Sequence, residues 1–128
     1  MKLLLDTCAF LWIVRDAPQL SDKARALFEE PDHEVYLSVV SVWEIAVKHR
    51  LGRLPLADPP GIYIPRERER HGITPLILTE TDALELEKLP DHHQDPFDRM
   101  LICQAKANDL VLLTPDRWIQ AYPVATAW

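Results

Sequence analysis

The sequence predicts an α/β fold: a three-layer sandwich with a central, mostly parallel sheet of four to five strands and helices on both faces. Two observations favour this class. Short apolar runs alternate along the chain with longer segments of helical periodicity. The apolar runs are nearly continuous, which is typical of strands that are buried on both faces of a parallel sheet. Because 128 residues make one ordinary domain, we expect a single domain over residues 1–128.

The expected strands are the short apolar runs at residues 2–6, 35–39, 73–78 and 110–116, with a fifth opened by Val124. The expected helices lie between them, at residues 9–14, 21–30, 42–51, 63–71, 81–89 and 96–107. Their ends carry familiar signals: Ser21 is a predicted N-cap, Gly52 and Gly72 end two helices, and Pro90 ends another. The DPPG segment at residues 58–61 is predicted to be a turn between helices.

Composition and charge limit the classes of function. No segment reaches the roughly 20 apolar residues of a membrane helix, and Asp6 interrupts the first apolar run before it attains signal-peptide length. Cys8 and Cys103 stand far apart and form no metal-binding or disulfide pattern. We therefore expect a cytoplasmic protein without a membrane partner. A net charge of −6 disfavours a broad electrostatic surface for nucleic acid, unless a cation neutralises the acids.

Two aspartates stand at the ends of predicted strands. Asp6 closes the first strand, and Asp116 closes the run VLLTPD. In folds of this class, ligands bind outside the carboxyl ends of the strands. Each aspartate alone is explained as the N-cap of the next helix. Together they indicate a shared crevice, because both are expected at the same edge of the sheet.

Glu44 lies within the segment SVVSVWEIAVKHRLG, which is predicted to be a helix that is apolar nearly all round and buried. A buried carboxylate is unfavourable unless it is paired or bound to a metal. Two interpretations stay open. One is an i,i+4 pair with Lys48, worth about 0.2–0.5 kcal/mol on an exposed face. The other is a functional carboxylate in the interior.

The stretch DHHQDPFDRM places two aspartates three residues apart at the start of a predicted helix. Asp95 precedes Pro96, which is the usual combination of N-cap and first helical residue. Asp98 shares a helix face with apolar residues and is expected to point inward, although the helix dipole also favours an acid in the first turn. His92 and His93 are interpreted as part of a polar loop rather than as a second metal site.

The sequence thus predicts four acidic residues that converge at one end of the sheet: Asp6, Glu44, Asp98 and Asp116. Their mutual repulsion is expected to raise at least one pKa unless a cation sits among them. Hard oxygen ligands favour Mg²⁺ or Mn²⁺ over zinc. Such an ion can activate a water for attack on a phosphodiester. The set therefore predicts hydrolysis of a nucleic acid.

Four segments resemble, in order and spacing, the PIN-domain ribonucleases, and specifically the VapC-type toxins of bacterial toxin–antitoxin pairs: LLLDT, SVVSVWEIAVKHRLGRL, DPFDRMLICQA and LLTPD. The resemblance runs from Leu3 to about Val124. It implies a PIN-like fold and carries the family's acidic quartet, as catalytic residues and metal ligands, onto Asp6, Glu44, Asp98 and Asp116. Thr7 and Thr114 are the accompanying hydroxyl residues. Asp95 is usual in the DPFDR variant, and its role as cap or outer-shell ligand is left open.

The resemblance further implies a Mg²⁺-dependent endoribonuclease, with Mn²⁺ as the other candidate ion. The implied protein is a homodimer, held inactive by a VapB-like antitoxin whose peptide occupies the active-site groove. Its implied substrates are structured RNAs such as tRNA or rRNA. Four basic residues near the proposed ligands are candidates for binding phosphate, with a solvated rim as the other interpretation: Lys48, Arg50, Arg99 and Arg117.

Other classes of function stay open. Asp6 followed by Thr7 also suits an aspartyl-phosphate enzyme or receiver domain, although Cys8 stands where the phosphatase version has a second aspartate. A non-catalytic interaction protein, whose acids are only caps and surface pairs, predicts no binding of divalent metal. A nuclease that acts on DNA rather than RNA is a further alternative.

Overall fold

The computed structural model describes residues 1–128 and contains one sheet of five strands, in the order β3-β2-β1-β4-β5. Every pair of neighbouring strands is parallel. The strands are β1 (Lys2–Leu5), β2 (Glu34–Ser38), β3 (Thr74–Leu76), β4 (Val111–Leu113) and β5 (Thr126–Ala127). The predicted α/β class with a parallel central sheet is confirmed.

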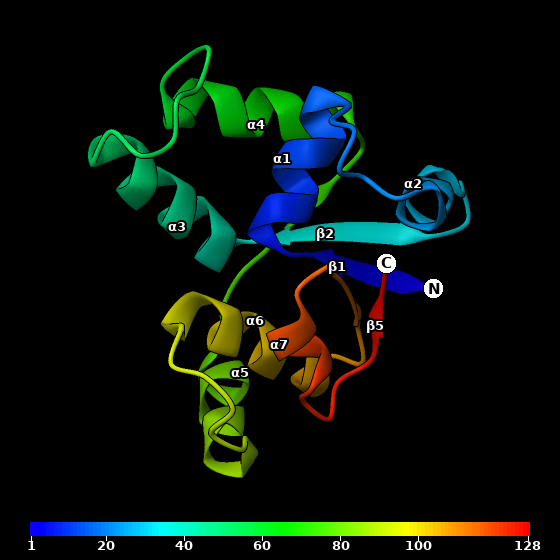
Figure 1. Ribbon diagram of the computed structural model, residues 1–128, viewed down its shortest axis with the longest axis vertical. Helices are drawn as coiled ribbons and strands as arrows, with labels where there is room; N and C mark the ends of the chain where they lie inside the picture. Colours follow the sequence, from blue (N-terminus) through cyan, green and yellow to red (C-terminus); the bar gives the residue numbers. More distant parts are fainter.

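Seven α-helices and one 3₁₀-helix surround the sheet: α1 (Thr7–Arg15), α2 (Asp22–Glu29), α3 (Val39–Arg50), α4 (Pro60–Arg70), α5 (Glu80–Leu84), η1 (Glu85–Lys88), α6 (Pro96–Ala107) and α7 (Arg117–Gln120). Figure 1 shows α1, α3 and α4 on one side of β1 and β2, and α5, α6 and α7 on the other. Helices thus cover both faces of the sheet, and the expected three layers are present. No helix is both long enough and apolar enough to cross a membrane.

The consecutive leucines of β1 divide the hydrophobic core into two halves. Leu3 and Leu5 belong to the half that contains Phe10 of α1, whereas Leu4 belongs to the half that contains Leu101 of α6. All five side chains are completely buried. Because successive side chains of a strand point to opposite faces, an uninterrupted apolar run gives the strand two apolar faces. The run KLLL therefore requires helices on both sides of the sheet.

The topology creates a crevice at the carboxyl edge of the sheet. β1 lies between β2 and β4, and the strand order reverses direction there. In open α/β sheets, ligands bind outside the strand ends at such a point. Asp6 directly follows β1, and Thr114 directly follows β4, so both lie at this edge.

Several element boundaries differ from the predictions. α3 begins at Val39 because Ser38 is its N-cap, with the Ser38 hydroxyl accepting from the backbone N–H of Val40 at 3.0 Å. α4 begins at Pro60, so part of the predicted DPPG turn is helical, with proline at a first-turn position that lacks an intrahelical N–H partner. The helix predicted over residues 81–89 divides into α5 and η1, and the four-residue helix α7 escaped prediction because it is too short to show periodicity.

The prediction that the helix around Glu44 is buried nearly all round is wrong. Glu44 is only 5% exposed and Ile45 is fully buried, but Trp43 is 65% and Val39 46% exposed. The reason is that α3 packs against α1, α4, α6 and β2, and these elements do not enclose it on every side. One side of α3 therefore presents apolar side chains to solvent.

We predict that Leu4→Ala lowers the free energy of unfolding by about 2–5 kcal/mol, measured by urea denaturation, because it opens a cavity beneath the central strand. Lys2→Ala is the matched control on the same strand, since the Lys2 side chain is exposed and its ion pair with Glu34 is long, at 3.8 Å. We expect the control to change stability by less than about 0.5 kcal/mol. Equal losses in the two variants would contradict the division of the core described above.

Candidate active site

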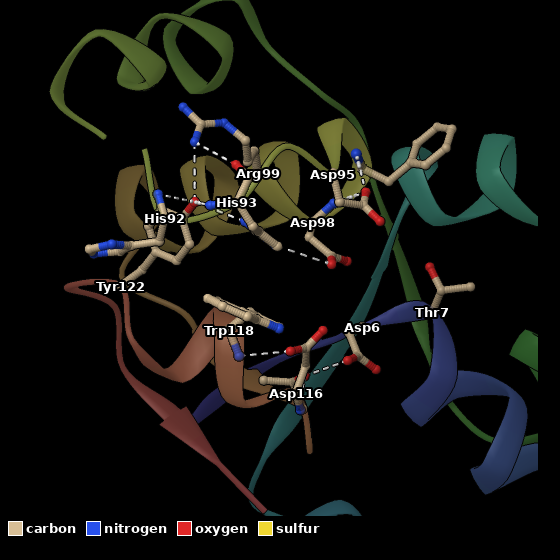
Figure 2. A network of polar contacts seen from close by, with 12 residues as sticks. Asp6, Thr7, His92, His93, Asp95, Asp98, Arg99, Asp116, Trp118 and Tyr122 are labelled. Atoms are coloured by element: carbon tan, nitrogen blue, oxygen red, sulfur yellow. Dashed lines mark hydrogen bonds and ion pairs between the residues drawn. The ribbon is translucent and has the colours of Figure 1, made fainter. Parts of the chain in front are cut away.

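An acidic pocket of about 350 Å³ opens at the carboxyl ends of β1 and β4. Its lining comes from the β1–α1 junction, α3, the start of α6 and the β4–α7 turn, and consists of Asp6, Thr7, Cys8, Glu44, Lys48, Asp95, Asp98, Pro115 and Asp116. The structure thus brings all four predicted acids together. Figure 2 shows the carboxylates of Asp6, Asp98 and Asp116 facing a common space.

Asp6 and Asp116 are linked through the hydroxyl of Thr114. Asp6 is the N-cap of α1, and one of its carboxylate oxygens accepts from the N–H of Ala9 at 2.7 Å. Its other oxygen accepts from the Thr114 hydroxyl, which itself accepts from the N–H of Asp116 at 3.1 Å. Asp116 is in turn the N-cap of α7. The cap and the functional interpretation are therefore compatible for both aspartates.

Glu44 is held by side chains on both sides. One carboxylate oxygen accepts from the Thr7 hydroxyl at 2.7 Å, and Thr7 lies 3.0 Å from the hydroxyl of Ser41. The other oxygen forms a close ion pair with the ammonium of Lys48, one helical turn away. Burial acts to lower the pKa of Lys48, but the hydrogen bond and the charge of Glu44 outweigh it and raise that pKa. The i,i+4 pair expected as the structural interpretation is thus present inside the pocket.

The two aspartates of the DPFD segment play different structural parts. Asp95 is the N-cap of α6, and one of its oxygens accepts from the N–H of Phe97 at 2.9 Å and of Asp98 at 3.1 Å. Asp98 makes no capping contact of its own and faces the pocket from the first turn of α6. Its carboxylate lies 3.4 Å from Nε2 of His93.

Burial, more than repulsion, raises the pKa values of Asp6 and Asp98. Burial raises the pKa of Asp6 from 3.8 to about 6, with further increases from the charges of Asp116 and Glu44. Burial likewise raises the pKa of Asp98 from 3.8 to about 7, followed by the charges of Asp95, Asp116 and Glu44. The expected effect of crowding on pKa is therefore present, but it is the smaller cause.

The donor chemistry of the pocket fits a hard divalent cation, because it offers carboxylate and hydroxyl oxygens. The thiol of Cys8 is a poor competitor, since burial raises its pKa to about 11 and disfavours the thiolate. In the arrangement observed, no three Asp, Glu, His or Cys side chains are grouped closely enough to hold an ion. The carboxylates instead contact hydroxyls, amides and Lys48. An oxygen that accepts one hydrogen bond still has a lone pair for a cation. Binding an ion therefore requires these side chains to approach one another more closely, and Glu44 to release Lys48.

Of the four basic residues predicted to bind phosphate, Lys48 alone lines the pocket. Arg50 and Arg117 are exposed outside its lining. Arg99 is turned away: its guanidinium donates to the carbonyls of Pro90 and His93 and to the Tyr122 hydroxyl, at 3.1 to 3.2 Å. Its side chain is only 13% exposed. The structure thus gives Arg99 a role in holding the loop before α6.

Sequence reasoning missed His93 as a neighbour of the acids. The prediction of a polar loop is right for its backbone, but the imidazole packs against the ring of Tyr122 and reaches Asp98. No local pattern could reveal this, because Tyr122 follows His93 by 29 positions. Cys8 was also not identified as a pocket residue, although it is separated from Asp6 by Thr7 alone.

Comparisons of sequence identify a protein family over most of the chain and a related protein over half of it. The family model of the PIN domain matches residues 3–124. Ribonuclease VapC16 of Mycobacterium tuberculosis is 37% identical over 64 residues, which are 50% of this chain and 45% of that protein. The match thus spans less than half the length of this curated relative.

Comparisons of structure identify toxin–antitoxin proteins with a similar fold. VapBC2 from Rickettsia felis, bound to a DNA fragment from its promoter, matches with a TM-score of 0.72 and 11% identity, over 99% of this chain and 98% of that one. VapBC-1 from nontypeable Haemophilus influenzae matches with a TM-score of 0.66 and 17% identity, over 99% of this chain and 97% of that one. A toxin–antitoxin complex from Klebsiella pneumoniae matches with a TM-score of 0.63 and 14% identity, over 98% of this chain and 96% of that one. At these identities the similarity shows the fold.

We predict that Asp98→Asn raises the melting temperature of the metal-free protein in EDTA, and more so at pH 8 than at pH 5. Because the folded-state pKa of Asp98 lies above its ordinary value, its contribution to stability is complete below about pH 4 and is lost as the pH rises to about 7. The asparagine removes that loss. Asp32→Asn, at an exposed site, is the control and should behave alike at both pH values. The prediction would be contradicted if the melting temperature fell more between pH 5 and pH 8 in Asp98→Asn than in the wild type.

For Asp95 we expect a stability effect that depends on capping alone. Asp95→Ala should lower the free energy of unfolding by about 1 kcal/mol, because two N–H groups of α6 lose their acceptor. Asp95→Asn should retain most of the stability, since asparagine is also a good N-cap. Urea denaturation at pH 7 distinguishes the two variants. A loss that is equal for alanine and asparagine would mean that the charge, not the cap, matters.

Proposed function

The chain belongs to the PIN-domain family, and from this premise we propose that it is a divalent-metal-dependent endoribonuclease and the toxin of a VapBC-type toxin–antitoxin pair. The observation that carries the proposal is the gathering of Asp6, Glu44, Asp98 and Asp116, from four separate parts of the chain, in one pocket. The partial sequence match to a VapC ribonuclease supports the choice of RNA as substrate.

In this proposal the four acids hold Mg²⁺ or Mn²⁺ and are the catalytic residues. The ion, when bound, would activate a water for in-line attack and stabilise the leaving oxygen of the phosphodiester. Thr114, whose hydroxyl contacts the Asp6 carboxylate and the backbone N–H of Asp116, would hold these two residues next to each other. Thr7 would fix the orientation of Glu44. Asp95 would support the site as the cap that fixes the first turn of α6.

Lys48 has a natural part in this scheme. In the structure its ammonium neutralises Glu44, which is otherwise a buried carboxylate. When Glu44 turns toward a cation, the ammonium is released at the mouth of the same pocket. We propose that it then contacts a phosphate of the substrate, because that is the anion that a metal-bound RNA would bring there.

The protonation of the pocket makes cation binding dependent on pH. Asp6 and Asp98 have raised pKa values of about 6 and 7 and thus carry protons when the pocket is empty and the pH is slightly acidic. A cation requires the carboxylate form, so its binding would release protons and become tighter as the pH rises through this range. Metal-dependent activity would rise in the same direction.

The proposed partners are an antitoxin and a second copy of the chain. Solved structures that share this fold include complexes of toxins with antitoxins, which supports a VapB-like antitoxin. The acidic pocket offers a complementary surface for a basic segment of such a protein. The homodimer is also a proposal, and the exposed Val39 and Trp43 on α3 offer an apolar surface for it. A tRNA or rRNA substrate and a cytoplasmic location complete the proposal.

The aspartyl-phosphate alternative makes Asp6 the group that attacks or accepts the phosphoryl group. It is less favoured because Cys8 stands where its phosphatase version has a second aspartate. Burial raises the pKa of the Cys8 thiol to about 11, so this side chain does not supply the missing acid. The alternative of a non-catalytic interaction protein predicts that no divalent metal binds. It is tested in the same experiment as the nuclease.

The test is cleavage of total RNA by the purified, antitoxin-free protein in Mg²⁺ or Mn²⁺, compared with EDTA and with Asp6→Asn. We expect discrete fragments that require the metal and disappear in the variant, because Asp6 is one of the four pocket acids proposed to hold the ion. Matched DNA strands serve as a substrate control. Intact RNA together with no metal binding by calorimetry would overturn the proposal in favour of a binding protein.

The same assay separates Asp98 from Asp95. Asp98→Asn should reduce cleavage below detection while the circular dichroism spectrum remains that of the wild type, since the side chain faces the pocket. Asp95→Asn should retain most of the activity, because the cap is preserved. If Asp95→Asn proves as damaging as Asp98→Asn, then Asp95 has a direct role in the reaction.

A further inference from the structure

A chain of polar contacts leads from the interior of the protein to the acidic pocket, and His93 is its last member. Figure 2 shows the imidazole of His93 between the hydroxyl of Tyr122 and the carboxylate of Asp98. Nδ1 of His93 lies 2.9 Å from the Tyr122 hydroxyl, and Nε2 lies 3.4 Å from Asp98. The Tyr122 side chain is buried beneath the loop that precedes α6.

The surroundings of the Tyr122 hydroxyl fix the tautomer of His93. Three N–H donors point at its oxygen: the backbone amides of His92 and His93, at 3.2 and 3.1 Å, and the guanidinium of Arg99, at 3.1 Å. A hydroxyl oxygen has two lone pairs and one proton to donate. These three donors already exceed the two lone pairs, so the oxygen has no room for a fourth donor. The hydroxyl proton therefore goes to the neighbour that can accept it, Nδ1 of His93. A protonated Nδ1 would leave the hydroxyl with four donors and no acceptor.

Because Nδ1 accepts, the neutral imidazole carries its proton on Nε2. That nitrogen is buried and has no hydrogen-bond partner of good geometry in the structure. Its nearest acceptor is the carboxylate of Asp98, at 3.4 Å. A small rotation of either side chain, with a shift of roughly 0.3 Å, would complete a hydrogen bond between them. The structure thus places a buried N–H group without a partner beside the carboxylate of Asp98 before any ligand is bound.

We propose that His93 is a positioning residue of the acidic pocket, whose Nε2–H orients the carboxylate of Asp98 for a divalent cation. The inference rests on the proposed function, since it assigns Asp98 to the cation. Carboxylates that bind metals are commonly oriented by hydrogen bonds from a second layer of residues, and loss of such a residue typically weakens metal binding by about 10- to 100-fold.

The geometry also excludes His93 itself as a ligand of the ion in this tautomer. Its Nδ1 lone pair is used by Tyr122, and its Nε2 carries a proton. The role of Arg99 follows from the same network, because its guanidinium holds Tyr122 and the carbonyl of His93. A basic residue that was expected to bind phosphate is therefore placed behind the site, where it supports the positioning of His93.

The first test is the tautomer of His93 in the metal-free wild-type protein, read from the ¹⁵N chemical shifts and long-range couplings of its imidazole. We expect a proton on Nε2 and an unprotonated Nδ1 at pH 8. Tyr122→Phe removes the hydroxyl but keeps the ring, and it should increase the fraction with the proton on Nδ1. A wild-type His93 with its proton on Nδ1 would overturn the proposal, because no donor would then face Asp98.

The second test is the affinity for Mn²⁺, measured by calorimetry at pH 8. His93→Leu should bind Mn²⁺ at least about 10-fold more weakly than the wild type, and His93→Gln, which retains an N–H donor, should recover most of the affinity. His92→Leu is the matched control: its ring packs against the same tyrosine, with centroids 4.7 Å apart, but it makes no contact with Asp98. Equal affinities of His93→Leu and wild type would overturn the proposal, as would equal losses in His93→Leu and His92→Leu.

These measurements separate the inference from the proposed function. If the wild type binds Mn²⁺ and the His93 series behaves as expected but RNA stays intact, the positioning role stands and the ribonuclease proposal fails. If the wild type and His93→Leu cleave RNA equally and bind Mn²⁺ with equal affinity, the ribonuclease proposal stands and the positioning role of His93 fails. A wild type that binds no Mn²⁺ overturns the positioning role. Where His93→Leu fails to fold, Tyr122→Phe provides the affinity comparison.

Discussion

The constraint on which the site depends is the burial of several carboxylates at one edge of the sheet. Charges in such surroundings are unfavourable unless each meets a proton, a donor or a counter-charge. Each acid here has a different solution. Asp6 has a hydroxyl and a helix amide, Glu44 a hydroxyl and Lys48, and Asp98 the imidazole of His93. The surrounding loops and helix ends are arranged so as to supply these partners.

The fold supplies part of this compensation through its helix ends. Asp6, Asp95 and Asp116 are the N-caps of α1, α6 and α7, whose first turns carry unpaired N–H groups and the positive end of the helix dipole. A parallel sheet places the starts of the helices that follow its strands at one edge, as for α1 after β1 and α7 after β4. The same topology that requires capping residues there also gathers them, so a structural and a chemical role for Asp6 and Asp116 arise from one cause.

The sequence was informative where the signal is local. Apolar runs predicted the strands, and Asp6 and Asp116 at their ends, with Glu44 in an apolar segment, predicted the composition of the pocket. The exposure of Trp43 and the direction of Arg99 could not be predicted, because both depend on which elements pack beside them. His93 is the clearest case. Its orientation depends on Tyr122, which lies on the far side of α6 and β4 in the chain, and no spacing rule connects the two.

The contact between Asp6 and Thr114 joins positions that are 108 residues apart and has a consequence for the order in which the molecule assembles. A nascent chain that has emerged only as far as α6 already contains Asp6, Glu44 and Asp98. It still lacks β4, which completes the pairing of β1, and the turn that carries Asp116. Because contacts of such long range form only once both partners are available, the pocket is completed only after β4 and the turn that follows it have been synthesised. A product that stops before β4 contains most of the acids but not the site.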